Sequence, residues 1–397
     1  EAKIILADEP FAQLDPHHQL HAMEVMQGEA ARGALVVVVL HDLSIAARHC
    51  SRVVILSKGT IAADGAPAET LSGDNLRSIF GVDAFIGELA RLHDRGARHF
   101  RFVDRTFNLN VKTSTRILEF FLDRMDERLF VHFELIPDHL PDALRAAIAK
   151  FPAGSLQFEI GIQTWNPVTQ ALISRKQDAD KTVANLRWLR DHSQALVHAD
   201  LIAGLPGEDL ESFAAGFDRL VALGPHEIQL GILKRLRGTP IIRHTTAYGL
   251  VFNPDPPYNV LATRAIDFAT MQRVARFARY WDLLANSGRF RRTLPRLLEP
   301  TPFGSFMSFS DWFFARVGRT HQLSLEHLFD GVHDYLVDVR GAPGAEVRAS
   351  LSEDYAATGA KGRLSFMARG LTVAVTSERP AGMHRASNRQ ARHLQAE

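Results

Sequence analysis

The stretch "QFEIGIQTWNP", residues 157–167, begins as an apolar strand and ends in polar residues before a proline. It is one of five short apolar strands that alternate with helices in the second part of the chain. Such alternation predicts a parallel sheet with helices outside, open or barrel-like, and polar residues gathered at the carboxyl ends of the strands. The expected strands are 99–107, 129–136, 155–164, 195–205 and 227–236, with helices at 87–95, 113–124, 141–150, 181–192 and 210–223.

The composition excludes several classes of protein. The chain has 397 residues, enough for two or three domains, and its 46% apolar and 23% charged residues are ordinary for a soluble globular protein. A net charge of +1 demands no polyelectrolyte partner, so no nucleic acid is predicted. The longest apolar run, 34–40, is too short to span a bilayer, and the first residues form neither a signal nor a transit peptide. We therefore expect a cytoplasmic protein.

The single cysteine, Cys50, restricts the metal chemistry. It excludes an intramolecular disulfide, a multi-cysteine zinc site and an iron–sulfur cluster held by this chain's own thiols. His49 adjoins it, but one thiol beside one histidine is more typical of a half-buried cysteine than of a ligand. No metal site is predicted.

The first 85 residues have an α/β pattern of their own. The valine-rich run at 34–40 is typical of a buried strand. We expect strands at 3–7, 34–40, 52–57 and 60–63, with helices at 16–31 and 43–49.

After residue 254 the alternation of strands and helices ends. One or two long helices are expected over 259–286, where apolar residues have helical spacing, and the aromatic-rich stretch 294–339 is also predicted to be helical. The last residues carry arginines with few apolar partners, so they are expected to be flexible. The expected domains are an α/β fragment at 1–85, a partial barrel at 86–253, a mainly helical domain at 254–376 and a basic flexible tail at 377–397.

An acid pair follows the first strand of the chain. In "KIILADEPFAQLD", residues 3–15, an apolar run leads into Asp8 and Glu9. One carboxylate in this position can hold magnesium through water, and the next can polarise an attacking water. Asp15 stands in the following loop, and "VVVVLHD" places His41 at the end of a second strand, within reach of a γ-phosphate. Together these residues indicate nucleotide hydrolysis.

On these motifs, residues 1–85 resemble the C-terminal third of an ATP-binding-cassette (ABC) ATPase of the type that serves importers of iron siderophores, haem and cobalamin. The resemblance implies a membrane permease as partner. The sequence contains no Gly-x-x-x-x-Gly-Lys-Ser/Thr phosphate loop, so binding of Mg–ATP would need a partner that supplies one. The resemblance further implies that Asp8 is the magnesium-side acid, Glu9 the catalytic base, Asp15 the aspartate that bridges a dimer and His41 the switch histidine.

Polar residues also follow the strands of the second part. Glu134, Gln163 and Asp200 lie at the ends of three successive strands, and Arg175 follows soon after Gln163. Because the carboxyl ends of parallel strands meet at one edge, these side chains are expected to line one bowl that holds a small molecule. Any one of them alone could be a solvated side chain, but the set favours function. For Asp104, a functional and a loop-capping role remain equally open.

The motifs "FRFVDRTFNLN", "EIGIQTWNP", "DLIAGLPGE" and "RFARYWDLLANSGRF" resemble radical S-adenosylmethionine (SAM) enzymes, most closely the group with an N-terminal cobalamin-binding domain. The resemblance covers about residues 85–397. It implies SAM as cofactor, with a [4Fe–4S] cluster and cobalamin in full-length relatives. By the same resemblance, SAM would be contacted by Glu134, Gln163, Arg175 and Asp200, and its adenine by the backbone at Ala203 and Gly204.

Such enzymes cleave SAM reductively with an electron from a cluster held by a Cys-x-x-x-Cys-x-x-Cys motif, which this sequence lacks. We expect five of the six units of their barrel. We therefore interpret the chain as a fusion, near residues 84–87, of an ABC-ATPase remnant and a truncated radical-SAM-like protein that is inactive as it stands, with a substrate that cannot be read from the sequence. Two alternatives stay open: the ATP-hydrolysing subunit of a metal-chelate ABC importer, and a non-catalytic SAM-binding module.

Overall fold

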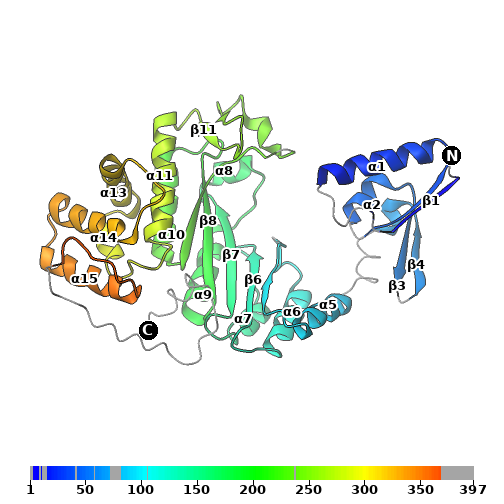
Figure 1. Cartoon of the computed structure of the whole chain (residues 1–397), viewed down its shortest axis with the longest axis horizontal. Coiled ribbons are helices and arrows are strands. Elements are labelled where there is room, and N and C mark those ends of the chain that lie inside the picture. The colour runs from blue at the N-terminus through cyan, green and yellow to red at the C-terminus, as the bar shows by residue number, and fades with distance from the viewer. Residues whose placement is uncertain are drawn as a thin grey trace. The chain divides into compact units, whose positions relative to one another are not determined.

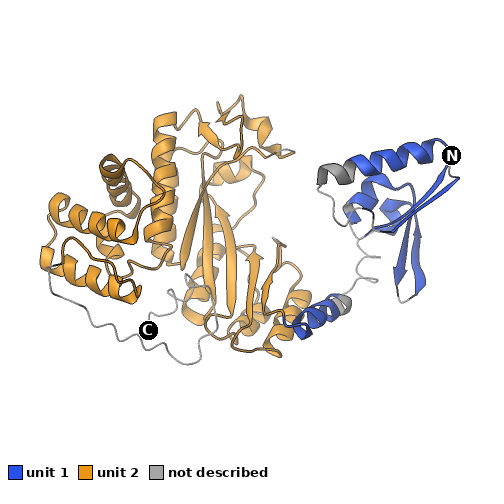
Figure 2. Cartoon of the chain, viewed as in Figure 1, with its two compact units in different colours: residues 1–96 blue, residues 97–397 orange. Residues whose placement is uncertain are grey.

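The computed structural model divides into two compact units, residues 1–96 and 97–397 (Figure 2). In the part of the chain that the structure describes, no helix is long and apolar enough to cross a membrane. The described residues are 3–8, 10, 16–40, 43–57, 59–71, 82–104, 106–236 and 238–367.

The first unit contains two small sheets (Figure 1). Strands β1 (Ile4–Asp8) and β2 (Leu35–Val39) pair in parallel, and helix α1 (Pro16–Ala31) connects them. Strands β3 (Val53–Ser57) and β4 (Thr60–Gly65) form an antiparallel hairpin. The strands and helices predicted for this part are therefore confirmed. The described residues of this unit also form helices α2 (Leu43–His49), α3 (Pro67–Thr70) and α5 (Val82–Asp94).

The expectation that 34–40 is a buried strand is wrong. Every second side chain of β1 and β2 is exposed, including Leu6 at 76%, Leu35 at 58% and Val37 at 46%. A continuous apolar run is normally covered on both faces of a parallel sheet. The described residues cover one face of this pair of strands and leave the other open.

The second unit is built on one parallel sheet of five strands in the order β5-β6-β7-β8-β9 (Figure 1). This confirms the predicted α/β class with a parallel sheet and all five predicted strands. They are β5 (His99–Arg101), β6 (Phe130–Leu135), β7 (Leu156–Gln163), β8 (Leu196–Ala203) and β9 (Glu227–Ile232).

The two faces of this sheet differ sharply in chemistry. Successive side chains on a strand point to opposite faces, so on β6 Phe133 faces one way while His132 and Glu134 face the other. Helices cover the apolar face, where Phe121 of α6 lies near Phe133 and the ring of Phe107 stacks on Phe133 with centroids 3.9 Å apart. The polar face is left free to line a site. The helices that follow the strands are α6 (Val111–Leu122), α7 (Asp142–Ile148), α8 (Pro167–Leu172), α9 (Ala179–His192) and α10 (Leu210–Leu223).

The region after the sheet is mainly helical, as predicted, but the prediction of helix from residue 259 is wrong. Residues Val260–Ala262 form strand β11, which pairs antiparallel with β10 (Val251–Phe252). Helix α11 (Phe268–Leu284) begins only after Asp267, whose carboxylate accepts a hydrogen bond from the Thr270 backbone N–H and caps the helix. The later helices are α12 (Leu294–Leu298), α13 (Pro302–Val317), α14 (Leu325–Asp334), a π-helical turn (Tyr335–Val339) and α15 (Gly344–Ala357). The predicted flexible tail at 377–397 lies outside the described residues.

A fully buried amide, Asn108, joins the loop after β5 to the loop after β6. Its Oδ1 accepts a hydrogen bond from the Ile136 N–H at 2.9 Å. Its Nδ2 donates to the carbonyl oxygens of Ile136 and His139. Since Ile136 leads away from the carboxyl end of β6, Asn108 fixes one wall of the region where that strand ends.

We expect Asn108→Leu to reduce the free energy of unfolding of the second unit by about 3 kcal/mol, because buried backbone groups would lose their partners. Urea unfolding followed by tryptophan fluorescence measures this unit alone, since all 4 tryptophans lie within residues 97–397. The matched control is Asn110→Ala, which removes the N-cap of α6 two residues away and is expected to cost about 1 kcal/mol. A smaller loss for Asn108→Leu than for the control would contradict the expectation.

Candidate functional site

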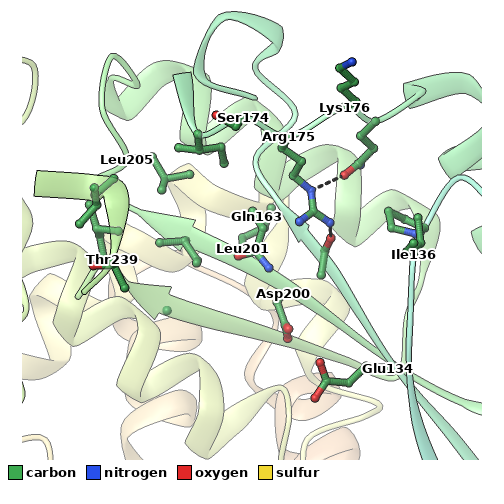
Figure 3. Close-up of a pocket in the computed structure, with 18 of the residues that line it drawn as sticks. Glu134, Ile136, Gln163, Ser174, Arg175, Lys176, Asp200, Leu201, Leu205 and Thr239 are labelled. Carbon is green, nitrogen blue, oxygen red and sulfur yellow. Dashed lines mark hydrogen bonds between the residues drawn. The ribbon is translucent and has the colours of Figure 1, made fainter. Parts of the chain in front are cut away.

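A cavity of about 930 Å³ opens at the carboxyl ends of β6 to β9 (Figure 3). This is the edge at which parallel sheets and barrels hold their ligands. The structure brings four of the predicted site residues together here. Its polar lining includes Glu134, Glu159, Gln163, Arg175 and Asp200.

Three carboxylates from neighbouring strands form the floor of the cavity. Glu134 on β6 and Glu159 on β7 are register partners, and the carboxyl groups of Glu134 and Asp200 face each other in Figure 3. Burial, followed by the negative charges of Glu159 and Glu134, raises the pKa of Asp200 to about 7. Burial thus favours the protonated form of Asp200, and its buried Oδ1 has no hydrogen-bond partner in the described part of the chain.

Gln163 enters the cavity from a distorted end of β7. The register with β8 shifts between Gly161 and Gln163, and Gln163 itself has a left-handed φ of 68°. Such a conformation costs about 1 to 3 kcal/mol and is often retained where a side chain must be aimed. The side chain crosses Gly161, where an added Cβ would lie 2.6 Å from Gln163 Nε2. Its buried Oε1 has no hydrogen-bond partner among the described residues.

Arg175 supplies positive charge on the opposite wall (Figure 3). Its guanidinium donates to the Gly161 carbonyl and, at 2.9 Å, to Gln177 Oε1, which are neutral acceptors. Burial lowers the pKa of Arg175, and the charges of Asp138 and Asp200 oppose this. Among the described residues it has no ion pair, and because a half-buried cation without one is costly, an anionic group of a ligand would be favoured beside it.

Ala203 and Gly204 lie at the end of β8 but are not part of the cavity lining. Gly204 has a φ of 84°, and an added Cβ there would lie 2.5 Å from Val260. Their neighbours Ile202 and Leu205 line the cavity instead. A contact of the Ala203–Gly204 backbone with a ligand therefore stays a prediction.

The remaining candidates lie apart from the cavity lining. Asp104 is exposed and accepts hydrogen bonds from the N–H and hydroxyl of Thr106, which favours the loop-capping interpretation. In the first unit, Asp8 is exposed at the end of β1, and Cys50 is half-buried, with a pKa raised by burial. The other ATPase-like candidates, Glu9, Asp15 and His41, lie outside the described residues.

The sequence interpretation missed three side chains beside this floor: His132, His198 and Glu227. They lie deeper along β6, β8 and β9, on the same face as Glu159. The alternation in "VHFEL" and "VHADL" carried the signal, since each histidine stands two residues before a floor carboxylate.

Comparison with family models gives two matches. Residues 75–220 match the Radical SAM superfamily, and residues 246–394 match a family described as "Protein of unknown function (DUF4080)". The expected likeness of the second part to radical SAM proteins is therefore confirmed at the level of the superfamily.

Curated relatives match a smaller part of the chain. The hemin import ATP-binding protein HmuV of Plesiomonas shigelloides is 40% identical over 94 residues, 23% of this chain and 36% of that protein. HmuV of Rhodopseudomonas palustris is 46% identical over 79 residues, 20% of this chain and 30% of that protein. The chain thus spans about a third of the length of these relatives. The likeness to ABC ATPases is confirmed only in part.

Similar solved structures include the radical SAM methyltransferase TsrM of Kitasatospora setae, bound to tryptophan and a SAM analogue. It is 20% identical with a TM-score of 0.36, over 40% of this chain and 32% of that one. Coproporphyrinogen III oxidase (HemN) of Escherichia coli is 22% identical with a TM-score of 0.33, over 40% of this chain and 38% of that one.

A second buried acid, Glu208, holds two loops beside the cavity together. It is 2% exposed, and its Oε1 accepts hydrogen bonds from the hydroxyl of Thr164 after β7 and from that of Ser212 on α10. Burial raises the pKa of Glu208 to about 7 from an ordinary 4.5. Its protonated form is therefore the one that the folded state favours.

We expect Glu208→Gln to remove a pH dependence of stability. Because the folded-state pKa is the higher one, the stabilising contribution of Glu208 is complete below pH 4.5 and is lost as the pH rises through about 7. The wild type should lose up to about 3 kcal/mol relative to the variant over this range. Urea unfolding at several pH values, followed by tryptophan fluorescence, measures the difference, with Glu211→Gln on exposed α10 surface as control. Parallel pH curves for wild type and Glu208→Gln would contradict this account.

Proposed function

We propose that the second unit binds S-adenosylmethionine in the cavity at the carboxyl ends of its strands, as a partial radical SAM barrel with five of six units. The observation that carries this proposal is the set of groups in one cavity: Glu134, Gln163, Arg175 and Asp200. The match of residues 75–220 to the Radical SAM superfamily supports it. The parent activity would be radical chemistry that starts from reductive cleavage of SAM.

The charges of the cavity suit this cofactor. SAM carries a sulfonium, an ammonium and a carboxylate, so it needs both acidic and basic partners. Glu134, Glu159 and Asp200 would face its positive groups, and Arg175 would pair with its carboxylate. The unpartnered Oε1 of Gln163 would accept a hydrogen bond from it. The volume of about 930 Å³ falls within the ordinary size of small-molecule sites.

The residues present do not fit a [4Fe–4S] cluster. Such a cluster needs several thiolates, whereas residues 97–397 contain no cysteine. What the chain's own residues provide is binding and orientation of SAM, with proton exchange at the floor carboxylates. By themselves, these residues are sufficient only for a non-catalytic module that binds SAM.

The ABC-like first unit supports a different candidate function, in which this part joins a partner that supplies a phosphate loop and a membrane permease. The partial match to HmuV proteins favours it. On this view Asp8, Glu9, Asp15 and His41 would act on Mg–ATP held by the partner, and the two units would have come together by fusion.

Isothermal titration calorimetry with SAM tests the main proposal. We expect micromolar binding by the full chain, and a loss of about 10-fold to 100-fold in Arg175→Met, because a hydrogen-bonded charge pair is worth about 1.5 to 3 kcal/mol. The matched control is Lys181→Met, which removes an exposed cation on α9 and should bind SAM as the wild type does. Absence of SAM binding in the wild type would overturn the proposal.

Titration with Mg–ATP separates the two candidate functions. We expect no binding by the full chain alone, because its sequence has no loop of backbone amides to hold the phosphates. Equilibrium dialysis with labelled ATP and magnesium, with and without SAM, measures this. Saturable ATP binding that Asp8→Asn weakens would support the ABC-like candidate instead.

A further inference from the structure

The acids of the cavity lie on different elements from two of its cations. Its four acids come from β6, β7, β8 and the loop after β6. Among the described residues, β9 and the segment that follows it contribute no acid to the lining, but they contribute Lys234 and Arg243. Leu205 and Thr239 lie at the end of the cavity away from Glu134 (Figure 3). The chemistry of the cavity therefore changes from one end to the other.

Aliphatic side chains form the wall at this second end. Leu205 and Leu233 are buried members of a core cluster of the second unit, and Ile173 and Ile241 pack against that cluster. All four line the cavity. An apolar group of a ligand placed on this wall would be removed from water, which favours its binding. We use the name basic end for these four side chains together with the two cations named above.

Arg243 is held at the basic end by uncharged groups. Its Nη2 donates to the carbonyl oxygen of Leu172 at 3.1 Å and to the hydroxyl of Ser174 at 2.9 Å, on either side of Ile173 in the chain. Its Nε donates to His244 Nε2 at 2.9 Å. In the part of the chain that the structure describes, Arg243 has no ion pair and its Nη1 has no hydrogen-bond partner. The guanidinium is thus fixed in place with donors left for a ligand.

Lys234 is the second cation of the basic end. It follows β9, it is exposed, and its backbone pairs with Asn259 in an antiparallel bridge. It too has no ion pair among the described residues. One exposed lysine would carry no argument, but here it lines the same cavity as a fixed guanidinium and an apolar wall. A carboxylate or phosphate bound at this end would gain charge-assisted hydrogen bonds.

We propose that the basic end is a second subsite of the cavity, which binds an organic anion with an apolar body. The body would lie on the four aliphatic side chains, and its carboxylate or phosphate would lie beside Arg243 and Lys234. The identification of this anion as the co-substrate of SAM rests on the function proposed above. Binding of the anion itself does not depend on that function.

The cavity can hold such an anion beside a second ligand. Its volume of about 930 Å³ lies near the upper end of the range of about 300 to 1,000 Å³ that small-molecule sites occupy. The groups assigned to SAM, which include Glu134, Arg175 and Asp200, are not members of the basic end. We therefore expect SAM and the anion to bind together and not to compete.

Methyl nuclear magnetic resonance of the full chain tests the subsite, with ¹³C-labelled isoleucine δ1 methyls and with octanoate and octyl phosphate as probes. We expect saturable shifts of the Ile173 and Ile241 methyls, with a dissociation constant on the order of 1 mM for the better probe. Ile148, which is buried on α7 and does not line the cavity, should not shift. Octylammonium, which has the same chain and the opposite charge, should bind at least about 10-fold more weakly. The tighter of the two anions identifies the anionic group that the subsite prefers.

Variants separate the two subsites. Arg243→Met should weaken octanoate binding about 10-fold, because it removes a charged donor, and should bind SAM as the wild type does. Arg243→Lys retains the charge and should lose less. Arg175→Met should show the reverse, with weakened SAM binding and unchanged octanoate binding. Lys181→Met, the exposed control on α9, should change neither.

Four results would overturn the proposal: absence of saturable octanoate or octyl phosphate shifts at Ile173 and Ile241, equal binding of octylammonium, an unchanged octanoate affinity in Arg243→Met, or competition between octanoate and SAM. If SAM does not bind but octanoate shifts these methyls in an Arg243-dependent way, the proposed function fails and the subsite stands. If SAM binds and neither anion shifts the methyls, the subsite fails and the proposed function stands.

Discussion

The parallel register of five strands is the constraint on which the second unit depends. Hydrogen bonding between neighbouring strands places Glu134 beside Glu159 and Gly161 beside Asp200. Because side chains alternate between the two faces, a slip of one residue in one strand would move its carboxylate from the cavity into the apolar core. No separate loop is therefore needed to bring the acidic side chains of the site together. Register alone brings them together.

Much of this architecture could be predicted from the sequence. Strands β6 to β9 and the helices between them follow from apolar runs long enough to show their period, whereas the strand predicted at 99–107 is only 3 residues long, as β5. The ribbon of β10 and β11 could not, because strands of 2 and 3 residues have no readable period and exist only through their pairing. The exposure of Leu6 and Val37 could not be predicted either, because a sequence shows that a residue is apolar but not which other residues cover it.

The candidate site was predictable in part for the same reason. Glu134 and Asp200 stand at or near the ends of recognisable strands, and the ends of parallel strands meet at one edge. The left-handed backbone of Gln163 was not predictable, because it arises from a register shift against β8. The packing of Val260 against Gly204 explains why that position is a glycine, while a contact of Ala203 and Gly204 with a ligand stays a prediction.

The two faces of the sheet have different roles: the apolar face stabilises the fold, and the polar face carries the acids of the candidate site. Phe121, Phe133 and Phe158 bury aromatic surface on the helix-covered side, where each large side chain contributes about 1.5 to 3 kcal/mol. The polar face contributes little by comparison, because ion pairs must first offset the cost of removing charges from water. A sheet stabilised from one side can thus carry acids on the other whose pKa values are far from ordinary. The raised pKa of Asp200 means that stability falls as the pH rises, and burial on the apolar face offsets this cost.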